Sequence, residues 1–121
     1  MKHLYVVTHP QATHHTAGLV GGWHGSALTD LGRLHAARIA QRLREIIPED
    51  APVELYSSDL QRARQTAEAI TSALRTPIQP TPDLREISYG DAEGQPQAWL
   101  DARFVHPPPT GNLLDHDVGI P

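Results

Sequence analysis

The sequence contains no cysteine, few aromatic side chains, no excess of basic charge and no long apolar run. Without cysteine there is no disulfide framework, no thiolate zinc site and no cysteine nucleophile. Ten Lys and Arg against 14 Asp and Glu give a formal net charge of -4, which disfavours a nucleic-acid groove. The apolar run Leu4 to Val7 is too short for a signal peptide or a membrane span. We therefore expect a cytoplasmic protein that binds neither nucleic acid nor membrane.

Three short runs rich in apolar and β-branched residues predict strands at 3–8, 53–57 and 77–80. The first of these is expected to be buried. Apolar residues spaced by three and four predict a helix that begins at Thr29 or Asp30 and runs to about Ile47, before Pro48.

The same spacing from Leu60 to Leu74 predicts a second helix, for which Asp59 is a credible N-terminal cap. A short helix is expected within 96–103, and the proline-rich segment 106–121 shows no periodicity. Alternating strands and helices predict an α/β protein with a parallel sheet flanked by helices. At 121 residues the chain fits a single domain spanning 1–121.

Polar residues follow two of the predicted strands. Thr8 and His9 end the first strand, and Ser57 ends the second, with Arg62 one turn into the helix that follows. Ligands of open parallel sheets bind beyond the carboxyl ends of the strands. An arginine on the first turn of a helix favours a phosphate or another oxyanion. His9 is then a candidate nucleophile or acid facing that anion.

Four segments, in chain order, resemble motifs of the histidine phosphatase superfamily, the phosphoglycerate-mutase-like phosphohydrolases and mutases. Leu4-Tyr5-Val6-Val7-Thr8-His9-Pro10 resembles the first strand with its Arg-His-Gly motif. Residues 27–32 resemble the "L-T-x-x-G" helix start, and residues 56–67 are similar to "S-S-D-L-x-R-A-x-x-T-A". Residues 84–94 are similar to "L-x-E-x-x-x-G-x-x-E-G". Together these segments cover most of the chain.

The resemblance implies a role for particular residues. His9 matches the nucleophile that becomes a phosphohistidine, and Arg62 matches an arginine that grips the phosphoryl oxygens. Glu86 matches the acid that protonates the leaving oxygen. His15 falls where many members carry a phosphate-contacting asparagine. Thr8, Arg62, His15 and Ser57 are therefore candidate substrate contacts, and no cofactor is implied.

Phosphoryl transfer through a phosphohistidine explains why a histidine, an arginine and a carboxyl group are needed together. A neutral imidazole attacks phosphorus without first losing a proton at pH 7. Phosphoryl transfer then depends on positioning and on stabilising charge on the equatorial oxygens, and the planar, permanently charged arginine fork suits that task. A carboxyl group supplies the proton that the leaving oxygen needs, and afterwards activates water.

The chain departs from the family pattern in two respects. Thr8 stands where the family has arginine, and Pro10 stands where it has glycine. A hydroxyl donates one hydrogen bond but carries no charge. Losing a transition-state donor typically costs on the order of 10²–10³ in rate. Residues that could supply the missing positive charge are Arg33, Arg64, His14 and His15.

The second departure is that the family's C-terminal half, with a further strand ending in a second histidine, has no counterpart in this sequence. The chain is therefore expected to be the N-terminal portion of a longer protein, or to complete its sheet as a homodimer. Leu4 to Val7 would otherwise present an unpaired apolar edge. The isolated 1–121 chain is expected to be catalytically weak or inactive.

The leading interpretation is a phosphatase-type enzyme that hydrolyses a small phosphorylated metabolite through a phosphohistidine. One alternative is a degenerate, non-catalytic member that binds a phosphorylated ligand or a protein partner, and Thr8 favours it. Another alternative is a phosphoglycerate-type mutase. A metal site is not expected, because the spacing of the clustered histidines and of 115–117 fits no zinc pattern.

Overall fold

The computed structural model describes residues 2–105 and divides them between two compact units. The helix–strand unit comprises the residues up to Thr13 together with Gly25–Arg85, and the loop unit comprises His14–His24 and the described residues from Glu86 on. The chain crosses between the units after Thr13, after His24 and after Arg85, so neither unit is one continuous segment. No helix within 2–105 has the length and apolar character needed to cross a membrane.

Helix α2 (Asp30–Ile46) confirms the first predicted helix and selects Thr29 as its N-cap. The Thr29 hydroxyl oxygen accepts a hydrogen bond from the Gly32 N–H at 3.0 Å, which satisfies one of the backbone donors that a helix start leaves without an intrahelical partner. Its buried residues recur at helical spacing: Gly32, Ala36, Ala40 and Leu43.

Helix α3 (Gln61–Leu74) confirms the second predicted helix, but the predicted cap is wrong. The N-cap residue is Leu60, whose apolar side chain makes no cap, and the Asp59 carboxylate is paired with Arg85 instead. The Leu60 N–H donates to the Ser58 hydroxyl oxygen at 3.2 Å. Helix α3 packs against α2 through a buried cluster made of Ala40, Leu43, Ile47 and Ile70.

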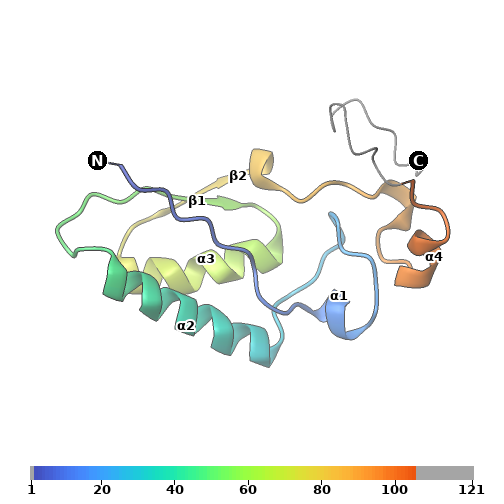
Figure 1. Ribbon diagram of the computed structural model, residues 1–121, viewed down its shortest axis with the longest axis horizontal. Helices are drawn as coiled ribbons and strands as arrows, with labels where there is room; N and C mark the ends of the chain where they lie inside the picture. Colours follow the sequence, from blue (N-terminus) through green and yellow to red (C-terminus); the bar gives the residue numbers. More distant parts are fainter. Residues whose placement is uncertain (1, 106–121) are drawn as a thin grey trace. The chain divides into compact units, whose positions relative to one another are not determined.

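Strands β1 (Leu55–Ser58) and β2 (Ile78–Thr81) confirm two of the three predicted strands, each within a few residues of its expected bounds. They form a parallel pair in which Leu55 lies opposite Ile78. Figure 1 shows α2 and α3 running beside this pair, with α3 in contact with both α2 and β1. A short 3-10 helix, η1 (Pro82–Leu84), follows β2 directly.

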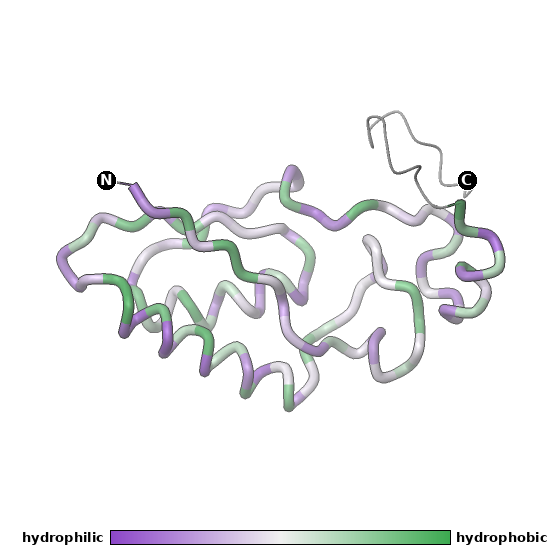
Figure 2. Tube along the Cα trace, viewed as in Figure 1, coloured by the Kyte–Doolittle hydropathy of each residue, from purple (hydrophilic) through white to green (hydrophobic). Residues whose placement is uncertain are grey.

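The predicted first strand is the element that the structure contradicts. Residues 3–8 form no strand, and the expectation of burial is wrong, since Leu4 and Val6 are 88% and 82% exposed. Tyr5 and Val7 are less exposed, at 43% and 37%. Side chains of an extended chain point alternately to opposite sides, so this pattern indicates that one side of the segment is partly covered. Figure 2 colours much of this N-terminal run as hydrophobic. An apolar run becomes a strand only where a neighbouring strand pairs its backbone groups.

The loop unit is held by backbone hydrogen bonds between its two segments. Val20 donates to the Gln95 carbonyl at 2.8 Å, and Gly94 donates to the Val20 carbonyl at 3.0 Å. The short elements are α1 (Thr13–Thr16, which begins at the junction), the 3-10 helix η2 (Gly90–Ala92) and α4 (Gln97–Asp101). Helix α4 confirms the helix predicted within 96–103. The segment 106–121, expected to lack periodic structure, lies outside the described residues.

Candidate active site

The His9 side chain is held through both ring nitrogens. Its Nδ1 lies 2.8 Å from the Pro10 carbonyl oxygen, and its Nε2 lies 3.3 Å from the Arg62 Nε. A carbonyl oxygen can only accept and a guanidinium N–H can only donate, so both contacts require the same neutral tautomer. Nδ1 therefore carries the proton, and Nε2 carries the lone pair. This is the state in which an imidazole attacks an electrophile.

Arg62 is the second residue of α3 and is only 2% exposed. Its guanidinium group meets a neutral imidazole at His9, and the first turn of α3 contains no acidic residue. A buried cation beside a helix N-terminus creates a positive potential, which favours an anion. The His9 lone pair, which accepts the Arg62 N–H, and the Arg62 charge thus lie side by side.

The chain that follows His9 is fixed by two other segments of the helix–strand unit. Ala12 and Leu28 form an antiparallel bridge, and the Gln65 side-chain oxygen on α3 accepts the Leu28 N–H at 2.7 Å. Gly32 at the start of α2 packs so closely on the Gln11 carbonyl that a Cβ atom has no room there. Sequence reasoning missed Gln65 and Gly32, although both lie in segments that match family motifs.

Ser57 and Thr8, the other predicted substrate contacts in the helix–strand unit, lie near Arg62 and His9 in sequence. Ser57 is buried at the end of β1, and its hydroxyl donates to the Ser58 carbonyl at 2.7 Å. Thr8 is exposed in the segment that leads into His9. Among residues 2–105, no three His, Asp or Glu side chains are grouped in a way that would hold a metal ion.

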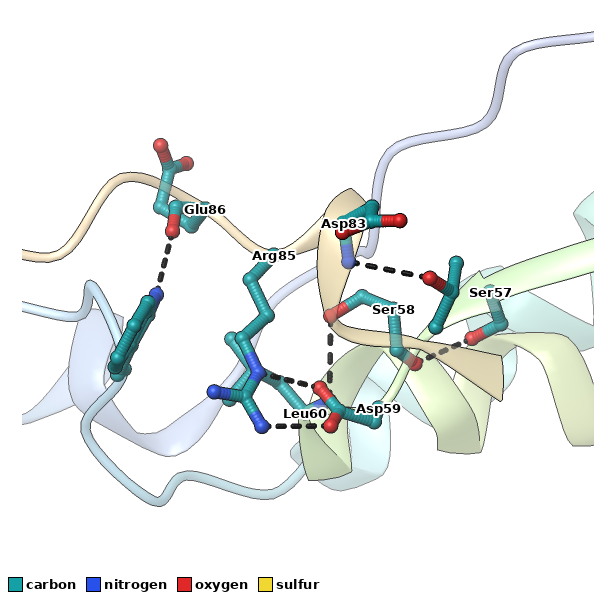
Figure 3. A network of polar contacts seen from close by, with 9 residues as sticks. Ser57, Ser58, Asp59, Leu60, Asp83, Arg85 and Glu86 are labelled. Atoms are coloured by element: carbon teal, nitrogen blue, oxygen red, sulfur yellow. Dashed lines mark hydrogen bonds and ion pairs between the residues drawn. The ribbon is translucent and has the colours of Figure 1, made fainter.

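An ion pair fixes the chain immediately before Glu86. Figure 3 shows the Arg85 guanidinium meeting the Asp59 carboxylate with two parallel bonds, Nε to Oδ1 and Nη2 to Oδ2, both at 2.6 Å. The hydrogen bond from Arg85 holds the pKa of Asp59 below its usual value, and the same contact raises the pKa of Arg85. Sequence reasoning missed this pair, although each partner stands in a matched motif.

Glu86 and His15 belong to the loop unit. The Glu86 carboxylate oxygen Oε1 accepts the Ile87 N–H at 2.9 Å, and the Glu86 carbonyl oxygen accepts the Trp23 indole N–H at 2.8 Å. The ring centroids of His15 and His14 are 4.0 Å apart, and His14 is buried against Gly21. The structure therefore brings His9 and Arg62 together in one unit, and it places Glu86 and His15 in the other.

The helices beside a parallel pair of strands and the contact between His9 and the buried Arg62 can be compared with those of known proteins. The model of the histidine phosphatase superfamily (branch 1) matches residues 4–112. The chain belongs to this superfamily, as the resemblance implied. The predicted α/β class is confirmed by solved structures of the same fold.

Three relatives illustrate the relationship. The metal-independent phosphoserine phosphatase of Arabidopsis thaliana is 37% identical over 92 residues, which is 75% of this chain and 37% of the relative. A protein of Yersinia pestis named probable phosphoglycerate mutase GpmB is 33% identical over 79% of this chain and 43% of its own length. A mycobacterial glucosyl-3-phosphoglycerate phosphatase, solved with VO3, superposes with a TM-score of 0.69 at 30% identity, over 78% of this chain and 45% of its own. The chain thus spans less than half the length of each of these relatives.

Proposed function

We propose that this protein is a phosphatase-type hydrolase that removes the phosphoryl group from a small phosphorylated metabolite through a phosphohistidine at His9. The observation that carries the proposal is the contact between Arg62 Nε and His9 Nε2 at 3.3 Å, with His9 Nδ1 held by the Pro10 carbonyl. It combines a nucleophilic lone pair with a buried cation. The names of the relatives support the substrate class, because two are phosphatases of small phosphorylated compounds.

In the first proposed step, the His9 Nε2 lone pair attacks phosphorus and the bond from phosphorus to the leaving oxygen breaks. The Glu86 carboxyl proton goes to that oxygen, so that the product leaves as an alcohol. Arg62 stabilises the equatorial phosphoryl oxygens. Thr8, Ser57 and His15 complete the proposed set of substrate contacts, and the reaction requires no cofactor.

In the second step, the Glu86 carboxylate takes a proton from water, and the resulting hydroxide attacks phosphorus. The P–N bond breaks, its electron pair returns to Nε2, and inorganic phosphate is released. If a second phosphorylated metabolite, rather than water, accepted the phosphoryl group, the same site would act as a mutase. The relative named as a phosphoglycerate mutase keeps that alternative open.

A non-catalytic binding role is the competing proposal, and a specific observation favours it. Thr8 stands in the position of the family's arginine and Pro10 in that of its glycine, so position 8 offers no charged donor. Such a protein would still bind a phosphorylated ligand or a protein partner through Arg62. Turnover or phosphohistidine formation therefore distinguishes the two proposals, whereas binding of phosphate alone does not.

The test is steady-state hydrolysis of p-nitrophenyl phosphate by the protein and three variants. His9→Ala should abolish turnover, and Arg62→Gln should lower kcat/KM by at least about 10² because a transition-state donor is lost. His35→Ala, an exposed histidine on α2, is the matched control and should leave turnover unchanged. Unchanged turnover in His9→Ala would refute the mechanism. Because the isolated 1–121 chain is expected to turn over weakly, retained phosphate binding without any phosphohistidine at His9 is the result that would favour the non-catalytic role.

The proposal includes several further points. We place the protein in the cytoplasm, because charged phosphorylated metabolites do not cross a membrane unaided. The net charge of -4 supports a small anionic substrate held by a local cation rather than a nucleic-acid partner. We also propose that both units belong to a single domain, since the chain crosses between them three times.

A second copy of the chain is the partner we propose for the exposed apolar run Leu4–Val7. Leu4 and Val6 are more than 80% exposed, and the backbone of residues 3–8 forms no ladder with any other described segment. Two such runs could pair edge to edge. Sedimentation equilibrium should show a dimer that Val6→Lys weakens, while Leu34→Lys at the half-exposed surface of α2 does not. A monomer at all concentrations would contradict this pairing.

A further inference from the structure

We propose that Trp23 and Glu93 are positioning residues that hold the main chain of Glu86 in place. The inference rests on the proposed role of Glu86 as the acid. The loop unit contains a small network in which one carboxylate, one indole and the 86–90 loop are tied together. The residues come from the glycine-rich loop before α2 and from the segment around η2.

Glu93 lies at the centre of this network. Its Oε1 accepts hydrogen bonds from three donors: the Trp23 N–H at 3.0 Å, the Ser88 hydroxyl at 2.9 Å and the Tyr89 N–H at 3.0 Å. Trp23 is 70 positions away in sequence from Glu93, whereas Ser88 and Tyr89 belong to the 86–90 loop. One oxygen therefore joins the glycine-rich loop to the loop that carries Glu86.

The charge state of Glu93 suits this role. Burial alone would raise its pKa, but the hydrogen bonds from Trp23, Ser88 and Tyr89 and the nearby His24 together lower it. The carboxylate is therefore ionised at neutral pH. Hydrogen bonds to an ionised acceptor are roughly twice as strong as those between neutral groups. The 86–90 loop is thus held by charge-assisted bonds as well as by the packing of Tyr89 against Val20, Ala92 and Leu100.

The backbone at position 22 is built for close approach to Glu93. Gly22 has a φ of 53°, and a Cβ atom placed there would lie 2.9 Å from the Glu93 Oε1. A residue with a Cβ atom would be strained at this positive φ and would press on the Glu93 carboxylate. The adjacent residue, Trp23, can consequently present its backbone N–H to Glu93 while its indole reaches the next loop.

The Trp23 indole makes the contact that concerns the chemistry. Its Nε1–H donates to the Glu86 carbonyl oxygen at 2.8 Å, although its side chain is 47% exposed. A tryptophan that served only the core would be buried, as Val20 and Ala92 are in this unit. The indole N–H instead contacts the main-chain carbonyl of Glu86, the candidate acid. Arg85, the residue before Glu86, is held separately by its ion pair with Asp59.

This arrangement gives an exposed acid a defined position. Glu86 itself is exposed, and its carboxylate contacts the N–H of the adjacent Ile87. Proton transfer to a leaving oxygen requires hydrogen-bond reach, and a misplacement of 1 Å can cost about 10² in rate. Trp23 and Glu93 contact the main chain around Glu86 and neither is proposed to touch the substrate. They act through Glu86.

The experiment compares substrates that differ in their need for an acid. The p-nitrophenolate leaves without a proton, whereas an alkyl oxygen requires one, so a defect in the acid should appear mainly with an alkyl phosphate. Trp23→Phe removes the indole donor and keeps an aromatic ring, and Glu93→Gln keeps an acceptor oxygen without the charge. We expect each variant to lower kcat/KM for an alkyl phosphate about tenfold and kcat/KM for p-nitrophenyl phosphate less than about twofold. The ratio kcat/KM reports formation of the phosphoenzyme, and it excludes the later hydrolysis in which Glu86 acts as the base for both substrates.

Two reference variants separate the inference from the proposed function. Glu86→Gln should show the same selective loss of kcat/KM in a larger form, and Trp99→Phe, which replaces the other tryptophan, should behave as wild type. If Glu86→Gln is selective but Trp23→Phe and Glu93→Gln are not, the positioning role is wrong and the proposed acid stands. If Glu86→Gln shows no selectivity, the proposed acid fails and the inference fails with it.

A second measurement does not require turnover. In nitrogen-15 NMR spectra, the Trp23 indole proton should exchange with solvent more slowly than that of Trp99, and Glu93→Gln should accelerate its exchange. Trp99→Phe assigns the signal, because the sequence holds only two tryptophans. Equal exchange of the two indole protons in the wild-type protein would contradict the contact on which the inference depends.

Discussion

The two units of this chain are stabilised in different ways. The helix–strand unit buries alanine, leucine and isoleucine side chains between α2, α3 and β1, and its elements follow the spacing of those residues. The loop unit has a smaller apolar cluster around Val20, Ala92 and Leu100, and hydrogen bonds that converge on Glu93 hold its 86–90 loop. Apolar truncation should therefore affect mainly stability in the first unit. Polar replacement should affect mainly the geometry of Glu86 in the second.

The largest expected loss of stability comes from removing an apolar side chain at the centre of the helix–strand unit. Ile70 on α3 is 4% exposed and belongs to the α2–α3 cluster. Ile70→Ala should lower the free energy of unfolding by about 3 kcal/mol, because the site cannot fully collapse. Ile46→Ala, which truncates the same side chain where it is 40% exposed, is the control and should cost less than about 1 kcal/mol. Urea unfolding measures both, and equal losses would contradict the assignment of the core.

Gly32→Ala tests the close packing that holds the chain after His9. An added Cβ would collide with the Gln11 carbonyl, which is backbone and cannot move without shifting the loop. We expect a loss of about 2 kcal/mol, within the range for overpacking, together with reduced turnover. Gly25→Ala is the matched control, because a Cβ there meets no atom within 4 Å. The account of this contact fails if Gly32→Ala is as stable as Gly25→Ala.

A smaller effect is expected at the start of α2. Thr29→Ala removes the N-cap bond to Gly32 and the hydroxyl bond to the Gln11 side chain, and it should cost about 1 kcal/mol. Thr29→Ser keeps an oxygen in the same place and should recover most of that loss. Thermal unfolding followed by circular dichroism compares the two variants. A serine variant as unstable as the alanine variant would show that the methyl group, not the cap, is what matters.

The smallest effect concerns pH. The pKa of Asp59 is lowered by Arg85 in the folded protein, so the pair stabilises the fold above the unfolded pKa of about 3.9. That contribution is lost as pH falls through the lower folded value. Asp59→Asn should therefore lower the urea midpoint at pH 7 but make it less sensitive to pH below about 4. Asp50→Asn, an exposed residue after α2, should keep the wild-type pH dependence. Identical profiles for Asp59→Asn and wild type would refute a contribution from the pair.

Helices and parallel strands were predictable because their signals are local. The Thr29 cap, the Pro48 stop and the apolar spacing from Leu60 to Leu74 all lie within the elements that they define. The first strand failed for the opposite reason. Residues 3–8 have strand propensity, but pairing depends on a neighbouring strand that propensity does not reveal. Asp59 failed as a cap because Arg85, distant in sequence, takes its carboxylate.

The candidate site shows the same difference between features with local signals and features that depend on distant contacts. His9 and Arg62 were found from strand-end placement and from matched motifs, and the structure brings them together. The network around Glu93 was not found, because two of its three donors are backbone N–H groups, which no residue type signals. The pairing of Trp23 with Glu86 spans 63 positions and follows only from the folded chain.

The central claim is that His9 becomes phosphorylated, and trapping the phosphoenzyme tests it most directly. Protein mixed with phosphorus-32-labelled alkyl phosphate and quenched in base should carry acid-labile, base-stable label that peptide mass spectrometry assigns to His9. Glu86→Gln treated with p-nitrophenyl phosphate should accumulate the adduct, because the second step lacks its base while the first needs no acid. His9→Ala should carry none. Turnover without any label on His9, or label that persists in His9→Ala, would contradict the account.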